Sequence, residues 1–271
     1  MKVAALQMVS GPRVPDNLAT ARALLETAAV GGAELAVLPE YFSAMGLSER
    51  DKLGHAERPG DGPVQAFLAR AAEELGLWIV GGTLPLVCSD PGRVRNSSLA
   101  FSPQGECVAR YDKVHLFRLA HGDEQIDESR TIEPGAAPVQ FTLTDRSGRA
   151  WCVGLSVCYD LRFPEFYRLH AAVGADLLVV PAAFTWTTGS AHWEVLLRAR
   201  AIENQVFVAA AAQGGRHENG RRTWGQSVVV DPWGKLLDEL AEGAGVVLAN
   251  ADPERLAEVR RQIPALSHRV F

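Results

Sequence analysis

Cysteine is scarce in this chain: there are four among 271 residues, and no two of them form a C-x-x-C pair. A disulfide scaffold is therefore not expected, and the thiols should be reduced. The seven histidines show neither an H-E-x-x-H motif nor a paired spacing with cysteine, so no metal and no cofactor is indicated. Basic residues are not in excess either. With a net charge of -5 and no stripe of Lys and Arg, nucleic acid is an unexpected partner.

Long hydrophobic runs are also missing. No apolar stretch approaches the ~20 residues that span a bilayer, and residues 1–17 indicate a strand and a loop rather than a signal-peptide core. We therefore expect a cytoplasmic protein without a membrane partner. What is present is enough apolar material, 47% of the chain, to build a large core. We expect residues 1–271 to form one α/β domain.

Short apolar runs alternate with segments of helical period, and this order occurs twice. The first half predicts strands at 2–8, 34–40, 77–84, 96–102 and 106–112, with helices at 17–30 and 63–74. The second predicts strands within 151–160, 176–184, 206–213, 226–234 and 246–252, with helices starting at Pro164 and Ala191.

Two β-α-β-α-β-β-β halves, at roughly 1–115 and 150–252, predict two sheets packed face to face with helices outside, a four-layer αββα sandwich. A single doubly wound sheet stays open as an alternative, because periodicity does not give the strand order.

Three side chains that can take part in catalysis lie at or just after the ends of predicted strands. Glu40 ends the strand at 34–40, Lys113 follows the strand at 106–112, and Cys158 closes the apolar run that starts at residue 151. In α/β sheets, ligands bind beyond the carboxyl ends of the parallel strands. Each residue alone also has an ordinary interpretation: a buried cysteine, a strand-end glutamate and a surface lysine.

Together the three side chains fit the hydrolysis of an amide. A thiol placed between a strand and a helix start is expected to have a lowered pKa, because the first N–H groups of a helix favour the thiolate. Glu40 could take and return the proton, and Lys113 could stabilise the oxyanion. Histidine is the rival base, with His115 and His192 as candidates.

Three separated motifs, AVLPEYF, ARYDKVHLF and GLSVCYDLRFPE, resemble those of the nitrilase superfamily of carbon–nitrogen hydrolases, and the resemblance covers essentially the whole chain. It implies the αββα sandwich, a catalytic set of Glu40, Lys113 and Cys158, and a thioester intermediate. It also implies a supporting glutamate at Glu128 in DESRTIEPG. Two neighbouring glutamates, Glu124 and Glu133, remain rivals for that role.

Within the superfamily, the segments SAHWEVLLRARAIENQVFVAAAAQGGRH and WGQSVVVDPWG are most similar to the deaminated glutathione amidases, and next to the omega-amidases. The resemblance implies a small amide substrate such as N-(4-oxoglutaryl)-cysteinylglycine. Alternatives are 2-oxoglutaramate or 2-oxosuccinamate, another amide, a carbamoylated amine or a nitrile. A further alternative is a binding module without activity. Relatives usually pair, so a homodimer or a higher homo-oligomer is expected.

A 2-oxo acid substrate needs a cation for its carboxylate. Arg162, four residues after Cys158, is suited to that role, although an ion pair with Asp160 or Glu165 would equally explain it. Further contacts to substrate are expected from the Tyr159 backbone N–H, Phe184, Thr185 and His192.

Overall fold

A computed structural model describes residues 1–122 and 124–270. One sheet contains β1 (Lys2–Gln7), β2 (Leu35–Val37), β3 (Trp78–Val80), β4 (Leu84–Val87), β5 (Val94–Phe101), β6 (Cys107–Asp112) and β15 (Gly245–Asn250). Its order is β15-β1-β2-β3-β5-β4, with β6 paired to β5. The other sheet contains β9 (Val139–Thr144), β10 (Ala150–Leu155), β11 (Leu177–Ala182), β12 (Phe207–Ala212), β13 (Ser227–Val230) and β14 (Leu236–Leu240), in the order β14-β13-β12-β11-β10-β9.

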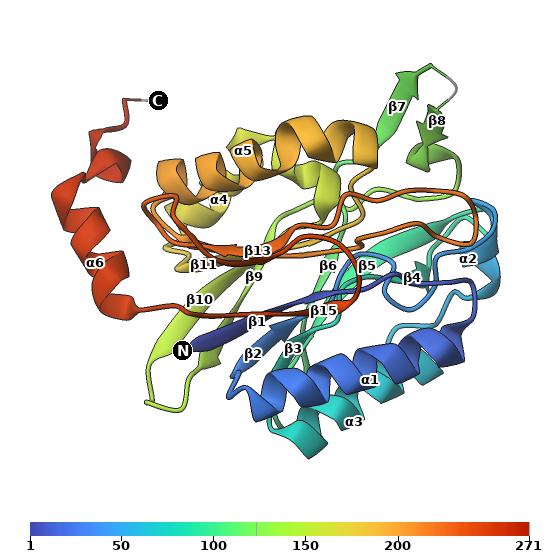
Figure 1. The fold of residues 1–271 in the computed structure, drawn as a ribbon, viewed down its shortest axis with the longest axis horizontal. Helices are drawn as coiled ribbons and strands as arrows, with labels where there is room; N and C mark the ends of the chain where they lie inside the picture. Colours follow the sequence, from blue (N-terminus) through green and yellow to red (C-terminus); the bar gives the residue numbers. More distant parts are fainter. Residues whose placement is uncertain (123, 271) are drawn as a thin grey trace.

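Helices lie outside both sheets (Figure 1). The first sheet is covered by α1 (Val14–Val30) and α3 (Pro63–Leu75), and the second by α4 (Pro164–Ala172) and α5 (Trp186–Asn204). The remaining elements are α2 (Asp51–Gly54), α6 (Pro253–Gln262), the hairpin of β7 (Arg118–His121) and β8 (Glu124–Asp127), and the 3-10 turns η1 (Glu128–Arg130), η2 (Cys158–Arg162) and η3 (Ala265–His268). The predicted αββα sandwich is confirmed, and the single doubly wound sheet is excluded.

Side chains alternate along β1 between two cores. Val3 and Ala5 face the other sheet and belong to the core between the sheets, whereas Ala4 and Leu6 pack with Leu25 of α1. Because both faces of this strand are buried, its sequence is almost continuously apolar instead of alternating with polar residues. Among the described residues, no helix combines the length and the apolar character needed to cross a membrane.

The assignment of residues 246–252 to the sheet of the second half is wrong. This segment forms β15, which pairs antiparallel with β1 from Lys2↔Asn250 to Gln7↔Gly245 and so completes the first sheet. The place next to β13 is taken by β14, whose sequence LLDEL is too polar to have been predicted as a strand. The chain therefore returns to its first strand near its end.

The predicted start of a helix at Ala191 is also wrong, since α5 begins five residues earlier, at Trp186. Thr185 caps the helix, and its hydroxyl accepts a hydrogen bond from the Thr188 N–H. A side chain that satisfies a free N–H lets the first turn form without an apolar stripe. The strand predicted at 34–40 ends at Val37, so Glu40 lies in the segment that follows β2.

Candidate active site

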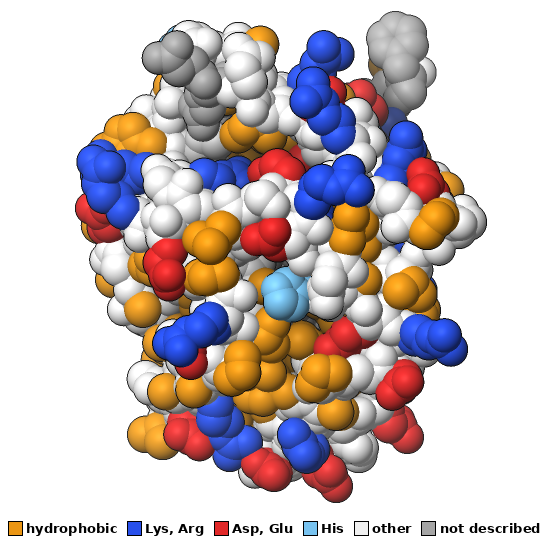
Figure 2. Space-filling view, turned by 90° about the vertical axis from the view of Figure 1, so that its right-hand side faces the viewer, with side chains coloured by type: hydrophobic (Ala, Val, Ile, Leu, Met, Phe, Trp, Pro, Cys, Tyr) orange, Lys and Arg blue, Asp and Glu red, His pale blue; other side chains and the backbone are white. Residues whose placement is uncertain are grey.

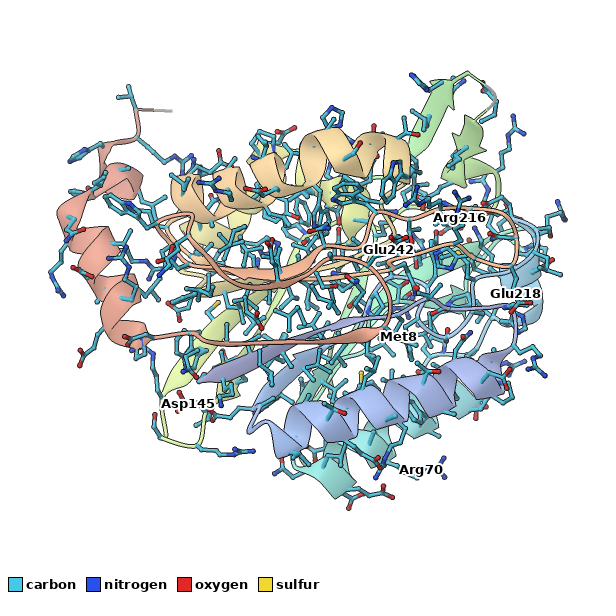
Figure 3. The ribbon with its side chains drawn as sticks, viewed as in Figure 1. Met8, Arg70, Asp145, Arg216, Glu218 and Glu242 are labelled. Carbon is cyan, nitrogen blue, oxygen red and sulfur yellow. The ribbon has the colours of Figure 1, made fainter. Side chains whose placement is uncertain are left out.

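The strand ends that carry the candidate residues meet at one side of the molecule. Glu40 follows β2, Lys113 comes directly after β6, and Cys158 follows β10. Figure 3 shows Met8, just beyond the end of β1, together with Arg216 and Glu218 from the loop after β12 on this side, and Asp145 at the opposite end.

Glu40, Lys113 and Glu128 form a buried row. The Lys113 ammonium donates to Glu40 Oε1 at 2.9 Å and to both oxygens of Glu128 at 2.9 and 2.8 Å. Glu40 also accepts hydrogen bonds from Asn96 Nδ2 at 2.9 Å and from the Ala183 N–H at 3.0 Å. Burial lowers the pKa of Lys113, but the carboxylates of Glu128 and Glu40 outweigh it and hold this pKa well above its usual value. The ammonium is therefore permanently charged.

Glu128 contacts the Lys113 ammonium through both of its carboxylate oxygens. Its carboxylate also accepts hydrogen bonds from the Tyr41 hydroxyl at 2.8 Å and from the Phe117 N–H at 2.6 Å. Burial raises the pKa of Glu128, but Lys113 outweighs it and keeps the pKa below its usual value.

Of the two rival glutamates, the structure describes the side chain of Glu133 only. Glu133 is paired with Arg95. The side chain of Glu124 lies outside the described residues.

Cys158 is held at the start of η2 with a left-handed backbone, φ 48°. The expectation of a lowered pKa is wrong. Burial and the nearby Glu40 carboxylate raise the pKa of this thiol well above its usual value, while the Lys113 ammonium and a backbone hydrogen bond from Ala183 oppose the rise. Burial is the largest of these effects, and the 3-10 turn that begins at Cys158 is only five residues long. In the resting protein the sulfur is a neutral thiol beside a carboxylate.

Asp160 fixes the turn that carries Cys158. Its carboxylate accepts hydrogen bonds from the Val157 N–H at 2.8 Å and the Tyr111 hydroxyl at 2.6 Å, and it contacts His115 Nδ1 at 2.7 Å. His115 also stacks on the Phe163 ring, with centroids 3.8 Å apart. The structure thus places His115 against Asp160, and the group with the largest electrostatic effect on the Cys158 thiol is Glu40.

A cleft of about 210 Å³ opens beside Cys158. Its lining comprises Phe117, Cys158, Tyr159, Arg162, Ala183, Phe184, Thr185 and Thr188. The Arg162 guanidinium lies over the rings of Tyr159 and Phe184, at 5.8 and 5.4 Å from their centroids. Among the described residues no carboxylate forms an ion pair with Arg162, so the alternative of a pair with Asp160 or Glu165 does not hold. The guanidinium is available for a ligand.

The other residues predicted to contact substrate differ in their position relative to this cleft. Thr185 lies in the wall, and its hydroxyl is 3.0 Å from that of Thr188. His192 is exposed on α5 and does not line the cleft, but its Nδ1 is 3.3 Å from Arg162 Nη1. Sequence reasoning missed Tyr41, Asn96 and Thr188; only Tyr41 carried a signal, as the residue beside Glu40 in AVLPEYF.

In the described parts of the chain, no group of His, Cys, Asp and Glu side chains is arranged to hold a metal ion. The chemistry available at this site comes from a thiol, two carboxylates and two cationic side chains.

Comparison with known proteins identifies the family. The model of the carbon–nitrogen hydrolases matches residues 2–261. The chain belongs to the carbon–nitrogen hydrolase family. It is therefore a hydrolase that acts on carbon–nitrogen bonds.

Two proteins similar to this carbon–nitrogen hydrolase are named as different kinds of amidase. A deaminated glutathione amidase from Synechocystis sp. is 43% identical over 270 residues, which is 99% of this chain and 97% of that protein. The omega-amidase NIT2-A from Xenopus laevis is 37% identical over 97% of this chain and 92% of its own length.

Solved structures share the fold. The C. elegans NitFhit protein superposes with a TM-score of 0.87 at 35% identity, covering 99% of this chain, which spans 65% of that longer protein. A mutant of the amidase from Nesterenkonia sp. AN1 superposes with a TM-score of 0.79 at 28% identity, over 97% of this chain and 98% of its own. The latter structure contains the product of Michael addition of acrylamide at its active-site cysteine.

Proposed function

We propose that this carbon–nitrogen hydrolase cleaves deaminated glutathione, N-(4-oxoglutaryl)-cysteinylglycine, to 2-oxoglutarate and cysteinylglycine. The proposal is carried by the buried Glu40–Lys113–Glu128 row beside the Cys158 thiol, with the Arg162 guanidinium in the adjoining cleft. The 43% identity to a deaminated glutathione amidase over nearly the full length supports the choice of substrate.

The first step is attack by Cys158 Sγ on the amide carbonyl carbon. Because the thiol is neutral at rest, its proton passes to Glu40 as the carbon–sulfur bond forms. The carbonyl oxygen gains negative charge and is stabilised by the Lys113 ammonium and the Tyr159 backbone N–H. Glu40 then gives its proton to the leaving nitrogen, the carbon–nitrogen bond breaks, and a thioester to Cys158 remains.

The second step reverses these roles. Glu40 takes a proton from a water molecule, whose oxygen attacks the thioester carbonyl under the same stabilisation by Lys113. The carbon–sulfur bond breaks, the thiol of Cys158 regains a proton from Glu40, and the acid leaves. Glu128 does not react in this scheme. It holds the Lys113 ammonium in place through two hydrogen bonds.

The 2-oxo acid end of the substrate binds in the cleft. Arg162 can hold its carboxylate with two hydrogen bonds, while Phe184 and Thr185 form the wall. His192, in contact with Arg162, orients the guanidinium from outside.

An omega-amidase acting on 2-oxoglutaramate or 2-oxosuccinamate is the second candidate, favoured by the 37% identity to NIT2-A. The test compares kcat/KM for deaminated glutathione, both oxo-amides, glutamine, a nitrile and a carbamoylated amine, with Cys158→Ala as the control. We expect the highest value for deaminated glutathione and no turnover by Cys158→Ala. A higher value for 2-oxoglutaramate would favour the omega-amidase, and no turnover of any compound would favour a binding module.

We further propose that the enzyme works in the cytoplasm as a homodimer or a higher homo-oligomer. All four cysteines are unpaired, as suits a reducing compartment. Sedimentation analysis of the purified protein tests the assembly.

A further inference from the structure

A second hollow, of about 540 Å³ including space open to solvent, adjoins the acid–lysine row. Among its lining residues are Tyr41, Lys52, Asn96 and Arg221. The proposed mechanism uses none of these four.

Hydrogen bonds connect lining residues of both hollows to the row. Tyr41, from the second hollow, and Phe117, from the Cys158 cleft, both donate to the Glu128 carboxylate. Asn96, also from the second hollow, donates to Glu40. The second hollow therefore borders the same two carboxylates as the Cys158 cleft.

Two cations, Lys52 and Arg221, line the second hollow with one carboxylate, Glu49, and the charge of Lys52 also acts on Glu128 of the row. Lys52 Nζ is 2.8 Å from Glu49 Oε2, and Arg221 Nη1 is 3.3 Å from Glu49 Oε1, so two cations share one carboxylate. Burial raises the pKa of Glu49, but Lys52 and Arg221 outweigh it and keep this pKa below its usual value. Both cations are mostly covered, with side-chain exposures of 13% and 27%.

The two cations are confined to the hollow and are not part of a larger basic surface. Figure 2, which looks onto the side where α2 lies in Figure 1, shows acidic and basic side chains interspersed among apolar ones, without a large area of one sign. A single anionic group is therefore the ligand that this charge distribution favours, rather than a polyanion.

We propose that Lys52 and Arg221 bind a carboxylate on the leaving amine, and so select amides of carboxylate-bearing amines over amides of ammonia. The inference rests on the proposed function, because it assigns the two carboxylates of deaminated glutathione to the two ends of one site. The 2-oxo acid goes to Arg162, and the glycine carboxylate of the cysteinylglycine portion goes to Lys52 and Arg221. An ω-amide such as 2-oxoglutaramate releases ammonia and has nothing to place there.

The experiment combines changes in the protein with changes in the substrate. The protein variants are Lys52→Met, Arg221→Met and the double variant, with Arg70→Met on the exposed outer side of α3 as the matched control (Figure 3). The substrates are deaminated glutathione, its analogue with the glycine carboxylate converted to an amide, and 2-oxoglutaramate.

We expect each single variant to raise KM for deaminated glutathione about tenfold, the loss typical of one charge-assisted contact. The wild type should show a similar rise when the glycine carboxylate is amidated. For the amidated analogue and for 2-oxoglutaramate, the variants should match the wild type and Arg70→Met. Equal losses on all three substrates, or no loss on deaminated glutathione, would overturn the proposal. Circular dichroism melting verifies that each variant is folded.

The same experiment distinguishes an error in the proposed function from an error in the proposed carboxylate site. If the wild type does not hydrolyse deaminated glutathione, the assigned reaction is wrong. Calorimetric titration of the Cys158→Ala variant with the same compound and its amidated analogue then decides about the carboxylate site without turnover. Tighter binding of the carboxylate form, lost in Lys52→Met and Arg221→Met, supports the inference; equal binding of both forms refutes it.

Discussion

The Lys113 ammonium is buried between two carboxylates, at 2.9 Å from Glu40 Oε1 and 2.8 Å from Glu128 Oε2. Its charge stabilises those carboxylates in the resting fold, and in the proposed mechanism it also stabilises the oxyanion. Loss of one oxyanion donor typically lowers kcat by ~100–1,000-fold. Loss of one partner from a buried ion pair costs about 3–5 kcal/mol of stability.

We therefore predict that Lys113→Met lowers kcat by at least about 100-fold and also lowers the melting temperature. Adding Glu128→Gln removes one of the two stranded carboxylates, so the double variant should regain stability without regaining activity. Steady-state kinetics and thermal unfolding check both parts. Near-normal turnover by Lys113→Met would refute the role of this side chain.

The neutral resting state of Cys158 also has a measurable consequence. Because burial raises the pKa of its thiol, alkylation near pH 7 depends on Glu40 to accept the proton. We predict that iodoacetamide labels Cys158 more slowly in Glu40→Gln than in the wild type, and that the rate in this variant rises with pH. Exposed Cys107, followed by mass spectrometry in the same samples, is the internal control. Equal labelling of Cys158 in both proteins would contradict proton transfer to Glu40.

At the level of the element, η2 depends on the Asp160 carboxylate. This group ties the turn to Tyr111 and His115 while Cys158 keeps a left-handed backbone, a conformation that costs about 1–3 kcal/mol for a residue other than glycine. Asp160 thus stabilises the geometry in which the sulfur faces Glu40.

We predict that Asp160→Asn lowers kcat by roughly 100-fold with a much smaller change in KM, because a displaced nucleophile affects reaction more than binding. His115→Ala should cost far less than Glu40→Gln, since His115 contacts Asp160 and not the thiol. If His115→Ala were the more damaging variant, histidine would be the base after all.

Elements with a clear apolar period were predictable, and those stabilised by distant partners were not. The strands at 2–8 and 206–213 are buried on both faces, which leaves a continuous apolar signal. β14 and α6 carry many charged residues, and their places are set by tertiary contacts. Similarly, Glu40 and Cys158 could be predicted from their strand ends and motifs, whereas Asn96 belongs to no such motif and its side chain contacts Glu40 across 56 residues of chain.

For the whole molecule, we propose that residues 1–271 form one domain. The core between the sheets includes Val37 from the first half and Val179 from the second, and β15 pairs with β1. We predict that far-ultraviolet circular dichroism and tryptophan fluorescence report coincident unfolding transitions. A chain ending at residue 244, without β15, should melt at a clearly lower temperature. Two separated transitions in the full chain would contradict a single domain.

The return of the chain to its first strand also bears on biosynthesis. β1 leaves the ribosome early, but the partner for its outer edge, β15, is made about 240 residues later. At synthesis rates of about 5–20 residues per second, that edge waits roughly 10–50 s. An unpaired strand edge is a template for pairing with other chains, so nascent copies are exposed to aggregation during this interval. Nascent copies are therefore more exposed to such pairing than the finished fold, in which β15 covers this edge.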